Sequence, residues 1–171
     1  MATFSDDPSE LQQLDWQLLQ NGPITLYLRR AVLDPDVAWL EERAYAVVEF
    51  DCLAWVDERH MHEALAETLS FPDYYGMNLD ALNDCMTDVS VPVESGLVLV
   101  FRRFDAFASE QRRVAQALLD ILAHSARRSL LFGRRLLVLV QSDDPRLAFE
   151  PVGATGVGWN RKEWLDKSRG V

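Results

Sequence analysis

The sequence predicts an α/β fold in which a small, mainly parallel sheet of three to four strands is flanked by helices. Short apolar segments of strand character alternate along the chain with longer segments of helical periodicity. Such alternation is typical of parallel sheets, whose strands are joined through helices. The chain has 171 residues, of which 49% are hydrophobic, and can bury one substantial core, so we expect one domain.

The N-terminal part is predicted to form a helix, a strand and a second helix. Residues 1–10 are a polar lead-in, and leucines at positions 11, 14, 18 and 19 indicate a short amphipathic helix that ends before the Asn-Gly-Pro run at 21–23. We expect a strand at 24–28, a helix at 35–45 that begins at Pro35, and a second strand at 46–50. This order favours a right-handed parallel crossover.

The middle of the chain supplies the remaining core elements. Asp57 is a good N-cap for a helix that runs to Leu69, because its side chain can accept from amides of the first turn. Further elements are expected in the order helix 79–89, loop 91–96, strand 97–101, helix 109–127 and strand 136–141. Residues 142–171 are polar and glycine-rich, and we expect a short helical segment around Trp159, Trp164 and Leu165 to pack back on the sheet.

The stretch at 71–89 has the most informative pattern. Pro72 disfavours helix before it, Gly76 can adopt a left-handed turn, and Asn78 is a favourable N-cap. Helical spacing then places one set of apolar side chains on the core face, namely Leu79, Leu82, Cys85, Met86 and Val89. The opposite stripe is polar and acidic and comprises Asp80, Asn83, Asp84 and Thr87, with Asp88 beside it.

Uncompensated negative charge marks this stripe. Between Arg59 and Arg102 the sequence has no Lys or Arg, although it has seven acidic residues there. Asp80 and Asp84 are i and i+4 neighbours, so their carboxylates repel one another. Asp80 alone is explained by the helix dipole, which an acidic residue in the first turn offsets. The stripe is therefore either a solvated helix face or a docking surface for a strongly positive partner.

The run Pro-Asp-Tyr-Tyr-Gly-x-Asn-Leu-Asp-Ala-Leu-x-Asp-Cys-x-Thr, at 72–87, resembles the signature of the barstar family, intracellular inhibitors of the ribonuclease barnase. A looser resemblance covers 46–141, including the Met-His pair at 61–62. It implies a three-layer barstar-like domain at 46–141, with an N-terminal extension at 1–45 that adds a strand-helix unit to the sheet and a C-terminal extension at 142–171.

The resemblance also implies a function and a set of contacts. The protein would inhibit a microbial guanyl-specific, barnase-like ribonuclease, a basic extracellular or toxin protein, and would be a monomer when free. In the family, the residues matching Tyr74, Asp80 and Asp84 contact the enzyme, and the equivalent of Asp84 occupies a phosphate subsite. The predicted partner-binding set is Tyr74, Gly76, Asn78, Asp80, Asn83, Asp84, Thr87 and Asp88.

Two departures from the family pattern leave a second function open. Asn83 stands where the family has a contacting tryptophan, and the glutamate on the family's last long helix has only Asp120 and His124 as nearby candidates. Loss of an aromatic anchor can change the partner of an interface. The alternative is a binding or immunity module of the same fold that recognises a different basic protein.

Charge distribution argues against nucleic-acid binding. Residues 1–101 carry a net charge of −15 and residues 102–171 carry +5, which sum to −10 for the chain. The acidic half would repel phosphate and favour association with a basic protein. The arginine doublets at 127–128 and 134–135 are interpreted as flanking secondary structure and pairing with carboxylates, because no aromatic residues alternate with them.

The sequence favours a non-enzymatic cytoplasmic protein without a cofactor or metal. Carboxylates along one helix lack the opposing wall that acid–base catalysis needs, and His60 and His62 are two apart, which would point them to different helix faces. Cys52 and Cys85 have apolar neighbours and are expected to be buried thiols rather than a disulfide. Neither a secretory signal nor a membrane-spanning run is visible.

Overall fold

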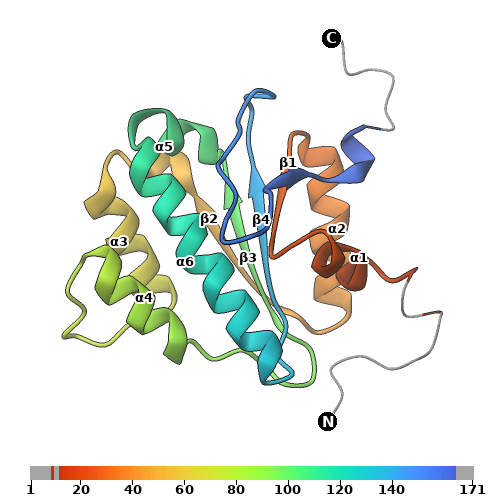
Figure 1. The fold of residues 1–171 in the computed structure, drawn as a ribbon, viewed down its shortest axis with the longest axis horizontal. Helices are drawn as coiled ribbons and strands as arrows, with labels where there is room; N and C mark the ends of the chain where they lie inside the picture. Colours follow the sequence, from red (N-terminus) through yellow and green to blue (C-terminus); the bar gives the residue numbers. More distant parts are fainter. Residues whose placement is uncertain (1–8, 10–11, 165–171) are drawn as a thin grey trace.

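One parallel sheet with the strand order β2-β3-β4-β1-β5 runs through the centre of the molecule (Figure 1). The structure is a computed structural model and describes residue 9 and residues 12–164. The strands are β1 (Ile24–Tyr27), β2 (Ala46–Asp51), β3 (Leu97–Arg102), β4 (Leu136–Gln141) and β5 (Gly158–Trp159). The α/β fold class is confirmed, but the described sheet has five strands rather than three to four.

Helices cover both faces of the sheet, which gives three layers (Figure 1). They are α1 (Leu14–Gln20), α2 (Arg30–Glu42), α3 (Glu58–Thr68), α4 (Leu79–Asp88), α5 (Phe104–Glu110) and α6 (Arg112–Leu131), with short 3-10 turns η2 (Cys52–Ala54) and η3 (Arg161–Glu163). Alternate residues of a strand point to opposite faces. Accordingly, Val98 and Val100 of β3 pack with α1 and α2, whereas Leu97, Leu99 and Phe101 pack in the larger core with α3 to α6.

The central strands β3 and β4 are buried on both faces, as their continuous apolar sequences predict. Strand β1 pairs with the outer side of β4, and β5 pairs with β1. The predicted crossover from β1 to β2 therefore joins parallel strands that are not neighbours, since β3 and β4 lie between them.

Two helix starts differ from the sequence predictions: α2 begins earlier, and the long helix α6 begins later, at Arg112. Helix α2 begins at Arg30 and contains Pro35, because burial of the Leu33 side chain outweighs the backbone hydrogen bond that proline cannot donate. Ser109 does not start the long helix but lies inside α5, where its hydroxyl donates to the carbonyl of Ala106. The aromatic core residues Phe104 and Phe107 fix this missed helix against the sheet.

The segment after β4 returns to the sheet as β5 and then forms the 3-10 turn η3. The carboxylate of Glu163 in η3 is fully buried and accepts from the backbone amides of Leu28 and Arg29 and from the Arg29 guanidinium, each at 3.0 Å. This contact joins the C-terminal segment to the start of α2. The predicted roles of residues 1–8, 10, Leu11 and Leu165 lie outside the described residues.

No helix in the described part of the chain is both long and apolar enough to cross a bilayer.

Candidate functional site

Helix α4 is seated on the core by one face and is capped at its start. The Asn78 side chain accepts from the backbone amide of Ala81 at 2.9 Å, which is the predicted N-cap. Leu82, Cys85 and Met86 are buried, and the hydroxyl of Ser125 on α6 donates to the Met86 carbonyl at 3.0 Å. These contacts fix the axial position and rotation of α4, and therefore the direction of its polar face.

The carboxylates of Asp80, Asp84 and Asp88 are exposed along this polar face. Each lies i, i+4 from the next, a spacing that brings side chains within about 5–6 Å on a helix. Among the described residues, no Lys, Arg or His side chain contacts any of these three carboxylates. The three aspartates thus form an acidic stripe without internal cations.

The polar residues between these aspartates are only partly accessible. Asn83 and Thr87 are half-buried, and the Thr87 hydroxyl donates to the backbone carbonyl of Asp84 at 2.7 Å. Burial raises the pKa of the Cys85 thiol, and the charges of Asp88 and Asp84 raise it further. The thiol is therefore protonated and unreactive at neutral pH. Cys52 is also buried and free, so both cysteines are buried thiols as predicted.

The loop before α4 presents the most exposed tyrosine of the site. Tyr74 is 85% exposed, whereas Tyr75 turns inward and contacts the fully buried His62 of α3. The left-handed residues of this loop are Ser70 and Met77, with φ of 56° and 51°, and the expectation that Gly76 takes this conformation is wrong. Gly76 instead lies against the cap, because a Cβ atom there would stand 3.0 Å from Asn78 Nδ2.

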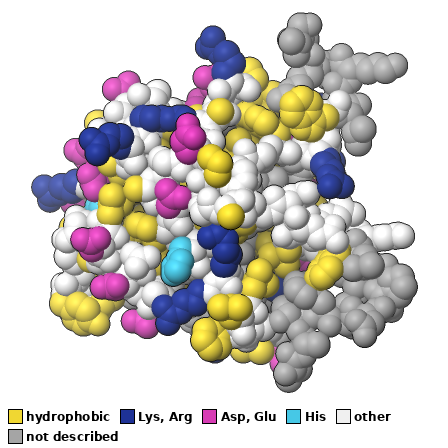
Figure 2. All heavy atoms as spheres, in the orientation of Figure 1, with side chains coloured by type: hydrophobic (Ala, Val, Ile, Leu, Met, Phe, Trp, Pro, Cys, Tyr) yellow, Lys and Arg dark blue, Asp and Glu magenta, His cyan; other side chains and the backbone are white. Residues whose placement is uncertain are grey.

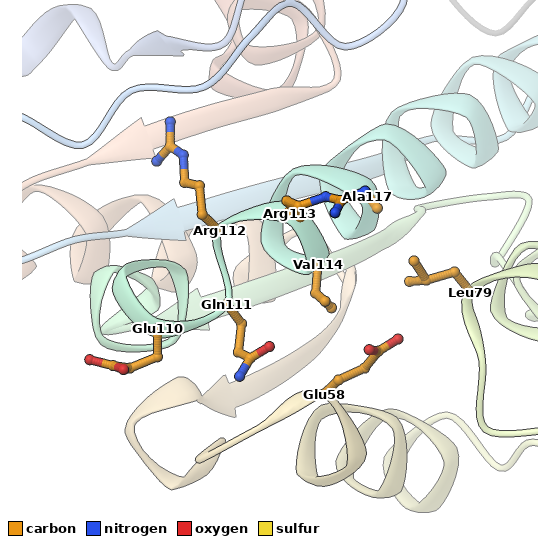
Figure 3. Close-up of a pocket in the computed structure, with 8 residues that line it drawn as sticks. All are labelled: Glu58, Leu79, Glu110, Gln111, Arg112, Arg113, Val114 and Ala117. Atoms are coloured by element: carbon orange, nitrogen blue, oxygen red, sulfur yellow. The ribbon is translucent and has the colours of Figure 1, made fainter.

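A hollow of about 630 Å³ adjoins the N-terminal end of α4 (Figure 3). Leu79 of α4 and Val114 of α6 give it apolar walls, and Glu58 of α3 lies on one side. Glu110 and Arg113 bring opposite charges to the α5–α6 side. The hollow therefore has no single sign of charge, unlike the stripe on α4.

Acidic and basic side chains are interspersed over the visible face of the molecule (Figure 2). Acidic side chains are spread over the part formed by α3 and α4, and basic side chains lie near α6 and also at the edge beside α3 and α5. Within the described ranges, no group of three or more His, Cys, Asp or Glu side chains could hold a metal ion. The acidic stripe on α4 thus presents exposed carboxylates on the surface. Asp120 and His124, the candidates for the family glutamate, are both exposed on α6.

Comparison with known proteins identifies a matching family and curated relatives that include a protein of Bacillus subtilis (strain 168). Residues 45–141 match the family described as Barstar (barnase inhibitor). Over 46 residues, the chain is 50% identical to a protein of Bacillus subtilis (strain 168) named "Putative ribonuclease inhibitor YrdF", a match that covers 26% of this chain and 46% of that protein. The matched region thus spans about half the length of that relative.

The solved structures to which the chain is similar include distant ones. Chains in the structures of Drosophila ORC bound to AT-rich or GC-rich DNA and Cdc6 are 11% identical, with TM-scores of 0.47 and 0.48. The matches cover 90% and 88% of this chain and 56% and 55% of those chains. At this level of likeness neither a shared function nor a shared partner follows.

Proposed function

The chain belongs to the barstar family, and from this premise we propose that it is a cytoplasmic inhibitor of a microbial guanyl-specific, barnase-like ribonuclease. The inhibitor would act by binding alone, as a monomer, with α4 placed in the active site of the enzyme. The partner is a basic extracellular or toxin protein, and neither a cofactor nor nucleic acid takes part.

The observation that carries this proposal is the exposed acidic stripe of Asp80, Asp84 and Asp88. Two carboxylates about 5–6 Å apart repel by roughly 0.7 kcal/mol in water and by roughly 3 kcal/mol at an effective dielectric of about 20. Any neutral partner that removed water from the stripe would increase this repulsion. A partner with several cations would instead convert it to attraction, so the stripe selects for a strongly positive surface.

The cleft of a ribonuclease is such a surface, because cationic side chains must hold the phosphates of its substrate. An aspartate carboxylate can accept two parallel hydrogen bonds from a guanidinium, as a phosphate does. Asp84, at the centre of the stripe, is our choice for the residue that occupies a phosphate position. Tyr74 adds an exposed aromatic ring, and Asn78, Gly76 and Thr87 would hold the geometry around it.

A different basic protein is the second candidate partner. Asn83 is half-buried and polar at the position where the family has a contacting tryptophan. Aromatic residues often carry much of the binding energy of an interface, so this change favours a partner other than a ribonuclease of the barnase type. Failure to inhibit any guanyl-preferring ribonuclease, together with salt-sensitive binding to another basic protein, would support this candidate.

The test is inhibition of RNA cleavage by purified barnase and related microbial ribonucleases. We expect Asp84→Ala to weaken inhibition on the order of 100-fold, the size typical for a charge pair buried across an interface, while the variant folds as stably as the parent. Glu67→Ala is the matched control, since Glu67 is an exposed acidic residue of α3 with the same charge. Equal effects of the two substitutions would reject the assignment of Asp84.

Association rates supply a second measurement. Attraction between a cationic cleft and the acidic stripe should speed association at low salt and lose this effect at high salt. The chain itself should not cleave RNA at any concentration, and turnover of RNA by the purified protein would overturn the proposal of a pure inhibitor.

A further inference from the structure

A second groove lies at the opposite end of α4 from the hollow of Figure 3. It has a volume of about 390 Å³ and runs between the C-terminal end of α4, the loop that follows it and the C-terminal end of α6. Met86 and Thr87 of α4 line it, together with Val91, Val93, Arg128, Phe132 and Arg134. Because Met86 and Thr87 belong to α4, the groove is continuous with the helix that carries the acidic stripe.

The groove combines an apolar floor with exposed apolar side chains at its edge. Met86 and Val91 are buried, whereas Val93 and Phe132 are 53% and 71% exposed. A large aromatic side chain left in water beside an apolar depression is typical of a surface that binds another molecule. Phe132 also supplies an aromatic contact on this side of the molecule, where α4 itself has Asn83 in place of an aromatic residue.

Two arginines of the groove have no partner within the described part of the chain. Eleven of the fourteen described arginines contact a carboxylate, a carbonyl oxygen or an aromatic ring through their guanidinium groups. Arg113, Arg128 and Arg134 have no such contact, and two of these three line this one groove.

The structure corrects the interpretation that the arginine doublets at 127–128 and 134–135 pair with carboxylates. Only Arg135 does so, through Asp15 at 3.0 Å, while Arg127 donates to the Val152 carbonyl. Arg128 lies in the last turn of α6, where the helix dipole favours a cation. The dipole does not account for a cation at Arg134, which lies beyond the helix, or for the presence of both arginines in one groove.

We propose that this groove binds a carboxylate-bearing, apolar segment of the same ribonuclease whose cationic cleft receives α4. The inference rests on the proposed function, because it assigns the groove to the same partner. Two free guanidinium groups beside an apolar floor are complementary to a segment in which acidic side chains stand next to an apolar side chain. The proposed partner is therefore a ribonuclease that has an acidic and apolar surface at the rim of its basic cleft.

A two-sign surface of this kind sets specificity. A nuclease that is basic on both sides of its cleft would bring its cations against Arg128 and Arg134 and be rejected. A nucleic acid fits less well than a protein, because its phosphates would lie beside the carboxylates of α4.

The test compares Arg128→Glu with Arg113→Glu. Both residues are exposed, unpaired arginines on α6, and 15 residues of helix separate them by about 22 Å. The two substitutions change the net charge equally, but the helix dipole favours a Glu near the start of α6 and disfavours one in its last turn. Inhibition is therefore compared under conditions in which urea unfolding shows both variants to be folded, so that a remaining difference reports the groove. We expect Arg128→Glu to weaken inhibition at least about 10-fold more than Arg113→Glu, a difference that persists at high salt.

A second pair tests the apolar part of the groove. Phe132→Ser should weaken inhibition, whereas Leu131→Ser should not, because Leu131 is 85% exposed but does not line the groove. Both side chains are largely in water, so neither substitution should unfold the protein. Equal effects within each pair would overturn the inference.

The outcomes separate this inference from the proposed function. If Asp84→Ala abolishes inhibition but Arg128→Glu behaves as Arg113→Glu, the groove is not part of the interface and the proposed function stands. If the parent protein inhibits no ribonuclease in the panel, both proposals fall together. Binding of a single-stranded RNA oligonucleotide that Arg128→Glu removes, with nuclease inhibition unchanged, would reassign the groove to nucleic acid.

Discussion

The imidazole of His62 meets the hydroxyl of Tyr75 where α3 packs against the loop that leads into α4, with 2.5 Å between Nδ1 and Oη. His62 has no exposed surface, and its other ring nitrogen, Nε2, lies 3.4 Å from the Glu58 carboxylate. Tyr75 also makes an edge-on contact with Phe71 in the same loop. Through Tyr75, the buried histidine holds the loop that presents Tyr74 on the surface.

Acid should destabilise the protein through this histidine. Burial lowers the pKa of His62, although Glu58 opposes the shift. The unfolded chain, with an ordinary histidine pKa of about 6.5, therefore takes up the proton first as the pH falls. The stability that the neutral imidazole contributes is present above about pH 6.5 and is lost as the pH falls through the lower folded-state pKa.

Urea unfolding at about pH 7.5 and about pH 5.5 measures this effect. We expect the free energy of unfolding to fall more between these two values in the parent protein than in His62→Gln, which cannot take up the proton. His60 and His124 are present in both proteins, so their contributions cancel in the comparison. An equal fall in the free energy of unfolding of both proteins would show that protonation of His62 does not cause the loss of stability in acid.

Removal of one charge from the centre of the acidic stripe should stabilise the free protein. Asp84 has carboxylates four residues away on either side, at Asp80 and Asp88, and no described cation contacts it. Relief of like-charge repulsion on a helix contributes about 0.2–0.5 kcal/mol per pair. Asp84→Asn should therefore raise the free energy of unfolding by a few tenths of a kcal/mol at low salt, and by less at high salt.

Asp80→Asn is the comparison within the same helix. Asp80 also loses a repulsive neighbour, but it lies in the first turn, where a negative charge is favourable. We expect it to gain less stability than Asp84→Asn or to lose some. If Asp84→Asn instead costs stability, the stripe makes internal contacts that the structure does not show.

Glu163 should be a sensitive carboxylate outside the site. Its buried side chain accepts three hydrogen bonds from the end of β1 and the start of α2, across more than 130 residues of sequence. Glu163→Gln removes the charge and one accepting oxygen, which we expect to cost about 1–3 kcal/mol of folding stability. Glu150→Gln, at an exposed side chain, should change the unfolding midpoint in urea little. Equal midpoints for both variants would contradict this role.

Local signals made much of the fold and of α4 predictable. The caps at Asp57 and Asn78 act within three residues, and both side chains accept the hydrogen bonds that the sequence predicts. The apolar runs of β3 and β4 are equally local. By contrast, α2 starts before Pro35 because Leu33 reaches the core, and this depends on tertiary packing that no local rule contains.

Features that join distant parts of the chain could not be predicted. The buried carboxylates of Asp15 and Glu163 look like ordinary surface acids in the sequence, and their partners lie up to 135 residues away. The groove lined by Val93 and Phe132 could not be predicted for the same reason, because these two residues come together only where the ends of α4 and α6 meet. The exposure of the α4 aspartates on one face could be predicted because helical spacing acts on one continuous stretch.

The space around Gly76 leads to the last prediction. A Cβ atom at this position would stand 3.0 Å from Asn78 Nδ2 and 3.4 Å from the Ala81 side chain, and the Gly76 carbonyl accepts from Asn78 Nδ2 at 3.1 Å. Gly76→Ala therefore requires the side chain of Asn78, the N-cap of α4, to shift by a few tenths of an ångström. A whole cap is worth about 0.5–2 kcal/mol, so we expect a loss of stability of up to this size, and inhibition should weaken with it because the acidic stripe becomes less well fixed. Gly156→Ala is the matched control, because a Cβ atom there meets nothing within 4 Å and the substitution restricts the unfolded chain. Thermal unfolding and ribonuclease inhibition of the two variants decide the matter: a Gly76→Ala protein as stable and as active as Gly156→Ala would mean that the cap tolerates the displacement and does not orient the stripe.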